Sequence, residues 1–244
     1  MGNNIILALD LRPPHMDAII SIAADLKSYV YGFKVGTVLN KLPGAAVCIA
    51  TKHAPVMVDR KFHNTPDAME EEAAAFQSAT IITVHASAGA RGIEAAQRGA
   101  PKALIAAVTV MTSMTDDDCF EIYQRSRRDA VTYLAEMAVR AGAHAIVCSG
   151  HEVRLLRQKP WMHNVKIITP GIRLHEDPRD DQEYVMTPGD AIYAGADYIV
   201  VGRSVMNYFH DGLTYKEASL QAIERLVGIK DAVDRAHERL AFTD

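Results

Sequence analysis

Short apolar runs alternate along this chain with longer stretches of helical periodicity. The runs are rich in β-branched residues and are continuously apolar, which is typical of parallel strands covered on both faces. There are eight of them, and each is followed by a longer connecting stretch. We therefore expect strands at residues 4–10, 31–36, 55–61, 80–85, 103–110, 143–149, 165–170 and 197–202.

The connecting stretches predict helices on the outside of such a sheet. Thr187 followed by Pro188 is a helix start signal, and Gly142 and Gly195 stand where helices should end. Eight strand–helix units within 244 residues predict one domain, residues 1–244, with the α/β architecture of a (β/α)₈ TIM barrel. A doubly wound open sheet is the competing architecture. The expected helices are residues 16–26, 67–78, 128–141, 187–194 and 214–240.

Composition and net charge limit the kinds of partner that this chain is expected to bind. The formal net charge is −4, which does not point to nucleic acid or a membrane surface as a partner. No apolar run approaches the ~20 residues of a membrane-spanning helix, and no signal peptide is apparent. The three cysteines lack metal-site spacing. We expect a cytoplasmic protein.

Charged residues cluster where the first three strands end. Asp10 ends the first strand, Lys34 lies within the second, and Asp59 and Lys61 end the third. In a TIM barrel the active site lies at the carboxyl ends of the strands. Strand alternation places Asp59 and Lys61 on one side and Arg60 on the other. Two lysines and two aspartates would neutralise one another there, and fixed charges of this kind suit a reaction in which negative charge moves.

A second set of residues predicts an anion site. The segment TPGIR at 169–173 follows the seventh strand and VGRS at 201–204 follows the eighth. Barrels frequently bind phosphate at these two positions. The glycines Gly171 and Gly202 let backbone N–H groups approach the anion, and Arg203 offers a bidentate charge.

Eight short segments carry a resemblance to a known family. They are ALD at 8–10, FKVG at 33–36, DRKFHNTP at 59–66, VHASAG at 84–89, VTVMTSM at 108–114, TPGIR at 169–173, DQ at 181–182 and VGR at 201–203. In order and spacing they resemble orotidine 5'-monophosphate decarboxylase, most closely its bacterial branch. The resemblance covers nearly the whole chain and implies the conversion of orotidine 5'-monophosphate to uridine 5'-monophosphate in pyrimidine biosynthesis.

The resemblance also implies a role for each matching residue. Lys61 would protonate C6 of the pyrimidine, Asp59 would lie beside the departing carboxylate, and Lys34 would link this network to the ribose. No metal and no organic cofactor is implied. The residues implied to bind substrate are Asp10 and Lys34 at the ribose, Thr112 and Ser113 at the pyrimidine, Gln182 between base and phosphate, Gly202 and Arg203 at the phosphate, and Arg173 as support for the closing loop of Gln182.

Asn64 departs from the family motif, Asp-x-Lys-x-x-Asp. The family's last aspartate reaches across a homodimer interface into the partner's site, and we expect Asn64 to do the same as a fourth catalytic residue. Asparagine has nearly the same shape and can bond a ribose hydroxyl, but it carries no charge. Three interpretations stay open: an introduced substitution that slows turnover, a natural variant that retains activity, or departure from the family's chemistry. The first two are favoured because the phosphate and pyrimidine motifs are whole.

Two other functions compete with the decarboxylase. A metal-dependent enzyme resembling 3-keto-L-gulonate 6-phosphate decarboxylase would share the Asp-x-Lys pair, but Lys34 stands where that family has a glutamate. A catalytically silent homologue would bind uridine or orotidine monophosphate and release no carbon dioxide. Chelation separates the first from the decarboxylase, and a turnover assay separates the second.

Overall fold

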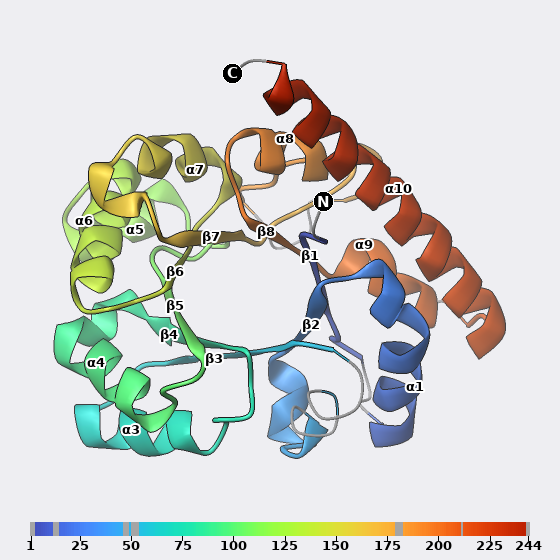
Figure 1. The fold of residues 1–244 in the computed structure, drawn as a ribbon, viewed down its shortest axis with the longest axis horizontal. Coiled ribbons are helices and arrows are strands. Elements are labelled where there is room, and N and C mark those ends of the chain that lie inside the picture. Colours follow the sequence, from blue (N-terminus) through green and yellow to red (C-terminus); the bar gives the residue numbers. More distant parts are fainter. Residues whose placement is uncertain are drawn as a thin grey trace.

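The centre of the molecule is a closed barrel of eight parallel strands in sequential order, β1 to β8 (Figure 1). The structure is a computed structural model that describes residues 3–11, 15–45, 49, 54–178, 183–210 and 212–242. The expected barrel is confirmed, with every strand shorter than its apolar run except β3, which has the expected length and lies one residue further along the chain. The strands are β1 Ile5–Ala8, β2 Gly32–Val35, β3 Val56–Phe62, β4 Ile81–His85, β5 Leu104–Val108, β6 Ala145–Val147, β7 Lys166–Thr169 and β8 Tyr198–Val201.

Closure of the sheet excludes the doubly wound alternative. The first and last strands pair in parallel register, with Ile5 opposite Ile199 and Leu7 opposite Val201. An open doubly wound sheet would leave these two edges apart. The barrel shape also places all eight carboxyl ends at one rim, where the charged residues of β1–β3 meet.

Strand alternation separates two apolar layers. Side chains such as Ile6, Met57 and Val200 fill the barrel interior, while Leu7 and Val58 belong to the larger core between sheet and helices. This is why the runs are continuously apolar: both faces of every strand are covered. The interior layer forms the floor beneath the carboxyl-end rim.

The helices surround the barrel (Figure 1). The expected starts and stops are confirmed at several ends: the Thr187 hydroxyl accepts from the Asp190 N–H, and Gly142 and Gly195 have positive φ. Among the described residues, no helix combines the length and the apolar character needed to cross a membrane. The α-helices are α1 Met16–Leu26, α3 Pro66–Ala74, α4 Gly89–Gly99, α5 Asp116–Tyr123, α6 Arg127–Arg140, α7 Gly150–Arg157, α8 Pro188–Tyr193, α9 Arg203–Met206 and α10 Tyr215–Ala241.

The boundaries differ from expectation at a few places. The helix expected over 67–78 ends at Ala74, and residues 75–78 form turns that lead toward β4. Short 3₁₀ turns, η2 Thr37–Asn40 and η3 Ala86–Ala88, follow β2 and β4. The last helix, α10, packs across α8, α9 and α1 and covers the side of the barrel where the ring closes (Figure 1).

Candidate active site

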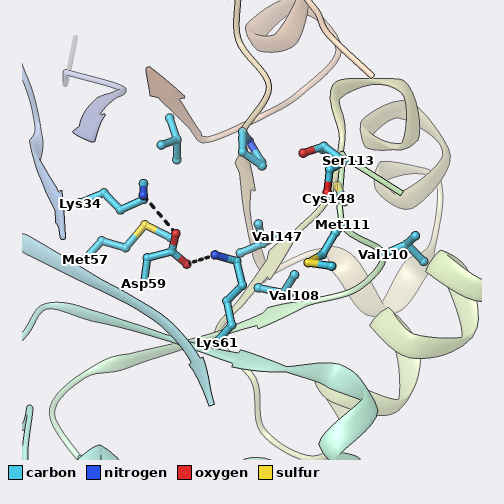
Figure 2. A pocket seen from close by; sticks show the side chains of 13 residues that line it. Lys34, Met57, Asp59, Lys61, Val108, Val110, Met111, Ser113, Val147 and Cys148 are labelled. Atoms are coloured by element: carbon cyan, nitrogen blue, oxygen red, sulfur yellow. Dashed lines mark ion pairs between the residues drawn. The ribbon is translucent and has the colours of Figure 1, made fainter. Parts of the chain in front are cut away.

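A cavity of about 240 Å³ opens at the carboxyl ends of the strands (Figure 2). Its floor is apolar and is made of inward-facing barrel residues, among them Met57, Val108 and Val147. One wall carries the charged residues of β2 and β3, and the opposite wall is the segment that follows β5. The lining residues are Lys34, Met57, Asp59, Lys61, Val108, Val110, Met111, Thr112, Ser113, Val147, Cys148, Pro170 and Val200.

A chain of ion pairs runs along the charged wall. Lys61 Nζ lies 2.9 Å from Asp59 Oδ1, and Lys34 Nζ lies 3.2 Å from Asp59 Oδ2 (Figure 2). Lys34 Nζ also lies 3.7 Å from Asp10 Oδ2. The predicted convergence of these four residues is therefore confirmed. Arg60 points away from the cavity, as strand alternation predicts, and donates to the Asn40 side chain.

Burial and pairing act in opposite directions on the two groups at the centre of this chain. Burial alone would raise the pKa of Asp59, but the ammonium groups of Lys34 and Lys61 lower it to about 2. Burial likewise lowers the pKa of Lys34, and the carboxylates of Asp59 and Asp10 more than offset this, so the net shift is upward. Both groups are thus held in their charged forms at neutral pH.

Lys61 is held in an unusual backbone conformation. Its φ is +49°, in the left-handed region that costs a non-glycine residue about 1 kcal/mol, and the register between β3 and β4 shifts between Val58 and Phe62. The fully buried hydroxyl of Thr83 on β4 accepts the Lys61 N–H at 2.9 Å. The same hydroxyl lies 3.1 Å from Asp59 Oδ1, to which it can donate. Thr83 therefore connects the backbone of one charged residue to the side chain of the other.

Sequence reasoning missed Thr83, although a signal existed. In the run TIITVH at 80–85, alternation puts Thr83 on the same face as Ile81, which lies in the barrel interior. A buried hydroxyl needs a hydrogen-bond partner. An inward-facing threonine beside the strand that ends in Asp59 and Lys61 indicates a supporting contact to that pair.

The segment after β5 supplies the polar residues expected at the base of a substrate. Thr112 is buried and Ser113 is exposed, and both line the cavity. The Thr112 carbonyl accepts from the N–H groups of Glu183 and Tyr184, so this segment contacts the chain that leads into α8. The two predicted residues thus face the charged wall across the cavity.

The predicted anion-binding residues lie in a neighbouring hollow. Arg173 and Arg203 line a separate cavity of about 170 Å³, and neither lines the cavity of Lys61. Gly202 precedes α9, and the nearest neighbour of an added Cβ there would be the Ala8 Cβ at 3.6 Å. Gln182 lies outside the described residues, so its expected place between base and phosphate has no counterpart in the structure.

Arg225 on α10 belongs to the same hollow and was not singled out from the sequence. Its guanidinium pairs with Asp177 and with Glu176 at 2.5 Å, and its Nε donates to the Ser204 carbonyl. These contacts tie the segment after β7 to the start of α9. A charged residue inside a long amphipathic helix gives no sequence signal of such a role, because most of them are solvated.

Asn64 lies apart from the cavity of its own chain. Its side chain is exposed, donates to Glu72 Oε1 at 3.2 Å and accepts from the Thr65 N–H at 2.8 Å. The structure therefore brings Lys34, Asp59 and Lys61 together without Asn64. Within the described part of the chain, no three His, Cys, Asp or Glu side chains are grouped so as to hold a metal ion.

This arrangement can hold a ring above an apolar floor with an ammonium at its edge. Of the two lysines and two aspartates, Lys34 and Asp59 are largely shielded from water, and fixed charges at such a site stabilise a carbanion more than they would in solvent. The carboxylate of Asp59 would repel a second carboxylate brought beside it. Loss of that second carboxylate as carbon dioxide would relieve the repulsion and leave the electron pair facing Lys61.

Comparison with known proteins agrees with this chemistry. Residues 3–213 match the model of the family described as orotidine 5'-phosphate decarboxylase / HUMPS. The chain is 37% identical over 205 residues to orotidine 5'-phosphate decarboxylase of Thermobifida fusca, covering 82% of this chain and 88% of that protein. It is 33% identical over 215 residues to the enzyme of that name from Legionella pneumophila, covering 84% and 93%. The crystal structure of orotidine 5'-phosphate decarboxylase from Lactobacillus acidophilus superposes with a TM-score of 0.75 at 25% identity, covering 95% of this chain and 99% of that one.

Proposed function

The chain belongs to the orotidine 5'-phosphate decarboxylase / HUMPS family, and from this premise we propose that it converts orotidine 5'-monophosphate to uridine 5'-monophosphate and carbon dioxide. The observation that carries the proposal is the Lys34–Asp59–Lys61 ion-pair chain on the wall of an apolar-floored cavity. The reaction belongs to pyrimidine biosynthesis. The enzyme class is carbon–carbon lyase.

The proposed step uses Lys61 as the proton donor. The bond between C6 and the carboxylate carbon breaks, its electron pair stays on C6, and carbon dioxide leaves. A proton then passes from Lys61 Nζ to C6. Asp59 holds Lys61 in place at 2.9 Å and disfavours the bound carboxylate, so the charge of the cluster is better matched to the transition state than to the substrate.

The remaining residues are proposed to bind the substrate. Asp10 and Lys34 lie at the end of the ion-pair chain, where they would bond ribose hydroxyls, and Thr112 and Ser113 would bond the pyrimidine. The Gly202 backbone and Arg203 would bind the phosphate in the neighbouring hollow. Gln182 would bridge base and phosphate, and Arg173 would support the loop that carries Gln182. Binding at the phosphate then contributes to the rate, because binding energy remote from the reacting carbon can be used to orient the ring.

Asn64 is proposed to act in the partner's site of a homodimer. Its exposed position outside its own cavity agrees with a side chain that serves a second copy. A neutral amide there would still bond a ribose hydroxyl, but it would lower the negative charge beside the partner's Lys61 by one. We propose a cytoplasmic homodimer with turnover slower than that of an Asn64→Asp form.

Turnover of orotidine 5'-monophosphate, followed by the fall in its absorbance, tests the proposal. We expect uridine 5'-monophosphate to form at an equal rate with and without a chelator. Tight binding of uridine 5'-monophosphate without carbon dioxide release would instead identify a silent homologue. Activity on 3-keto-L-gulonate 6-phosphate that disappears on chelation would favour the metal-dependent alternative.

A further inference from the structure

Arg127, the first residue of α6, is a buried arginine outside the cavity just described. Its side chain is 7% exposed, and arginine is almost never buried to this extent unless it is paired. Nothing in the proposed reaction uses it. Its contacts therefore need an explanation of their own.

One set of contacts holds the segment that carries the pyrimidine-facing residues. Arg127 Nη2 donates to the Met114 carbonyl, and Nε donates to Asp116 Oδ1 at 3.1 Å. Met114 comes directly after Ser113, and Asp116 begins α5. The guanidinium thus forms hydrogen bonds at the end of the segment that includes Thr112 and Ser113.

A second set of contacts holds the chain that leads into α8. The Arg127 guanidinium carbon lies 4.1 Å from the centre of the Tyr184 ring, within cation–π range. The Tyr184 hydroxyl donates to the same Asp116 oxygen at 2.6 Å. The two segments are therefore joined through one arginine, one aspartate and one tyrosine.

This junction continues to the anion-binding side. Two residues beyond Tyr184, the Met186 N–H donates to the Gly171 carbonyl at 3.1 Å, and the Met186 carbonyl accepts from the Arg173 N–H at 3.0 Å. A short parallel bridge between Ile172 and Met186 results. A displacement of Tyr184 would therefore also displace the backbone of Arg173.

Glu152 on α7 is a further charged neighbour of Arg127. Its Oε1 lies 3.9 Å from Arg127 Nη1, and both side chains are 7% exposed. Burial raises the pKa of Glu152, and the neighbouring guanidinium opposes that rise. A buried arginine in contact with four neighbours, Met114, Asp116, Tyr184 and Glu152, has little freedom to move, which suits a residue that fixes the position of others.

We propose that Arg127 is a positioning residue that holds the pyrimidine-side segment 111–116 and the phosphate-side segment 183–186 in register. The expected effect on catalysis rests on the proposed function, whereas the contacts between the two segments do not. Loss of the guanidinium weakens the junction, which then depends on the Tyr184–Asp116 hydrogen bond and on the Glu183 and Tyr184 N–H groups that donate to the Thr112 carbonyl. The substrate then meets its base-binding and phosphate-binding groups in a less favourable relative placement. A misplacement of about 1 Å can reduce a rate by about a hundredfold.

The test compares Arg127→Met with Arg127→Lys and with Arg157→Met. Arg157 is a fitting control because it also pairs with an aspartate and bonds two carbonyls, those of Gly195 and Val165, but at the opposite rim of the barrel. Hydrogen exchange of peptides covering 183–186 is measured together with kcat and KM for orotidine 5'-monophosphate. We expect Arg127→Met to speed exchange at the amides of Glu183 and Tyr184 and to lower kcat/KM by about ten- to a hundredfold. Arg157→Met should leave both unchanged.

A second variant distinguishes a loss of positioning from a folding defect. Tyr184→Phe removes only the hydroxyl that bonds Asp116, so the chain should fold normally and lose about three- to tenfold in kcat/KM. Arg127→Lys should recover only part of the loss, because lysine cannot bond Met114 and Asp116 in one plane. Wild-type exchange and wild-type kcat/KM in both Arg127→Met and Tyr184→Phe would overturn the proposal. An inactive wild type would instead reject the proposed function, and faster exchange in Arg127→Met would still support the junction.

Discussion

Replacing Thr83 by valine removes one hydroxyl and keeps the shape of a fully buried side chain. The lost bond to the ionised Asp59 contributes roughly 1.5–3 kcal/mol, and the Lys61 N–H left without a partner costs roughly 1–3 kcal/mol. Because these two terms overlap, we expect the free energy of unfolding to fall by about 2–4 kcal/mol. That loss is within the ~5–15 kcal/mol of a typical domain, so the variant should still fold.

The same change should slow catalysis. Thr83 holds the backbone of Lys61 in a left-handed conformation and orients Asp59, which in turn holds the Lys61 ammonium. Each ~1.4 kcal/mol of lost transition-state stabilisation is a factor of ten in rate. We expect kcat to fall about ten- to a hundredfold with little change in KM, measured by single-turnover absorbance of orotidine 5'-monophosphate.

Two companion variants make the Thr83 result interpretable. Thr83→Ser keeps the hydroxyl and should restore most of the rate. Thr109→Val removes an equally buried hydroxyl that donates to the Val147 carbonyl at 3.1 Å, with no contact to the charged cluster. It should cost about 1 kcal/mol of stability and leave kcat within about twofold. Equal values of kcat for Thr83→Val and Thr109→Val would show that Thr83 does not position Lys61.

Other predictions follow from the charged groups. Asn64→Asp should raise kcat because it restores an anion beside the partner's Lys61, and equal single-turnover rates for the two forms would count against this role. The pKa of Asp59 is lowered from 3.8 to about 2, so its pairing should contribute roughly 2 kcal/mol of stability above pH 4 and lose it as the pH falls toward 2. Denaturant unfolding at a series of pH values checks this: the wild type should lose more stability than Asp59→Asn between pH 4 and 2, and parallel curves would contradict it. Dialysis against a chelator should leave turnover unchanged; a loss recovered with magnesium would point to the metal-dependent alternative.

Much of the barrel could be predicted from the sequence because its physical cause is local. Continuous apolar runs and the signals at helix ends depend on neighbouring residues only, and they located all eight strands. Convergence of Asp10, Lys34 and Asp59 with Lys61 follows from one further rule, that parallel strands in a barrel end at a common rim. Local pattern and simple topology were sufficient for these features.

Support for the site could be predicted only in part. Alternation places Thr83 on the inward face beside Asp59, but its bond to the Lys61 N–H depends on a register shift in β3 that no period-two pattern contains. Arg127 lies between Arg125 and Arg128 in the sequence, and no local pattern distinguishes this buried arginine from the two exposed ones. Its burial depends on how α5, α6 and α7 pack together. Contacts between segments that are distant in the sequence cannot be predicted from local patterns.

The proposed reaction depends on protonation, by the Lys61 ammonium, of the carbon from which carbon dioxide departs. The most direct measurement is the single-turnover rate of carbon dioxide release by Lys61→Ala, with the affinity for uridine 5'-monophosphate measured in parallel. We expect this variant still to bind the nucleotide but to release carbon dioxide at least about a thousandfold more slowly than the wild type. Release within tenfold of the wild-type rate by the variant would contradict it.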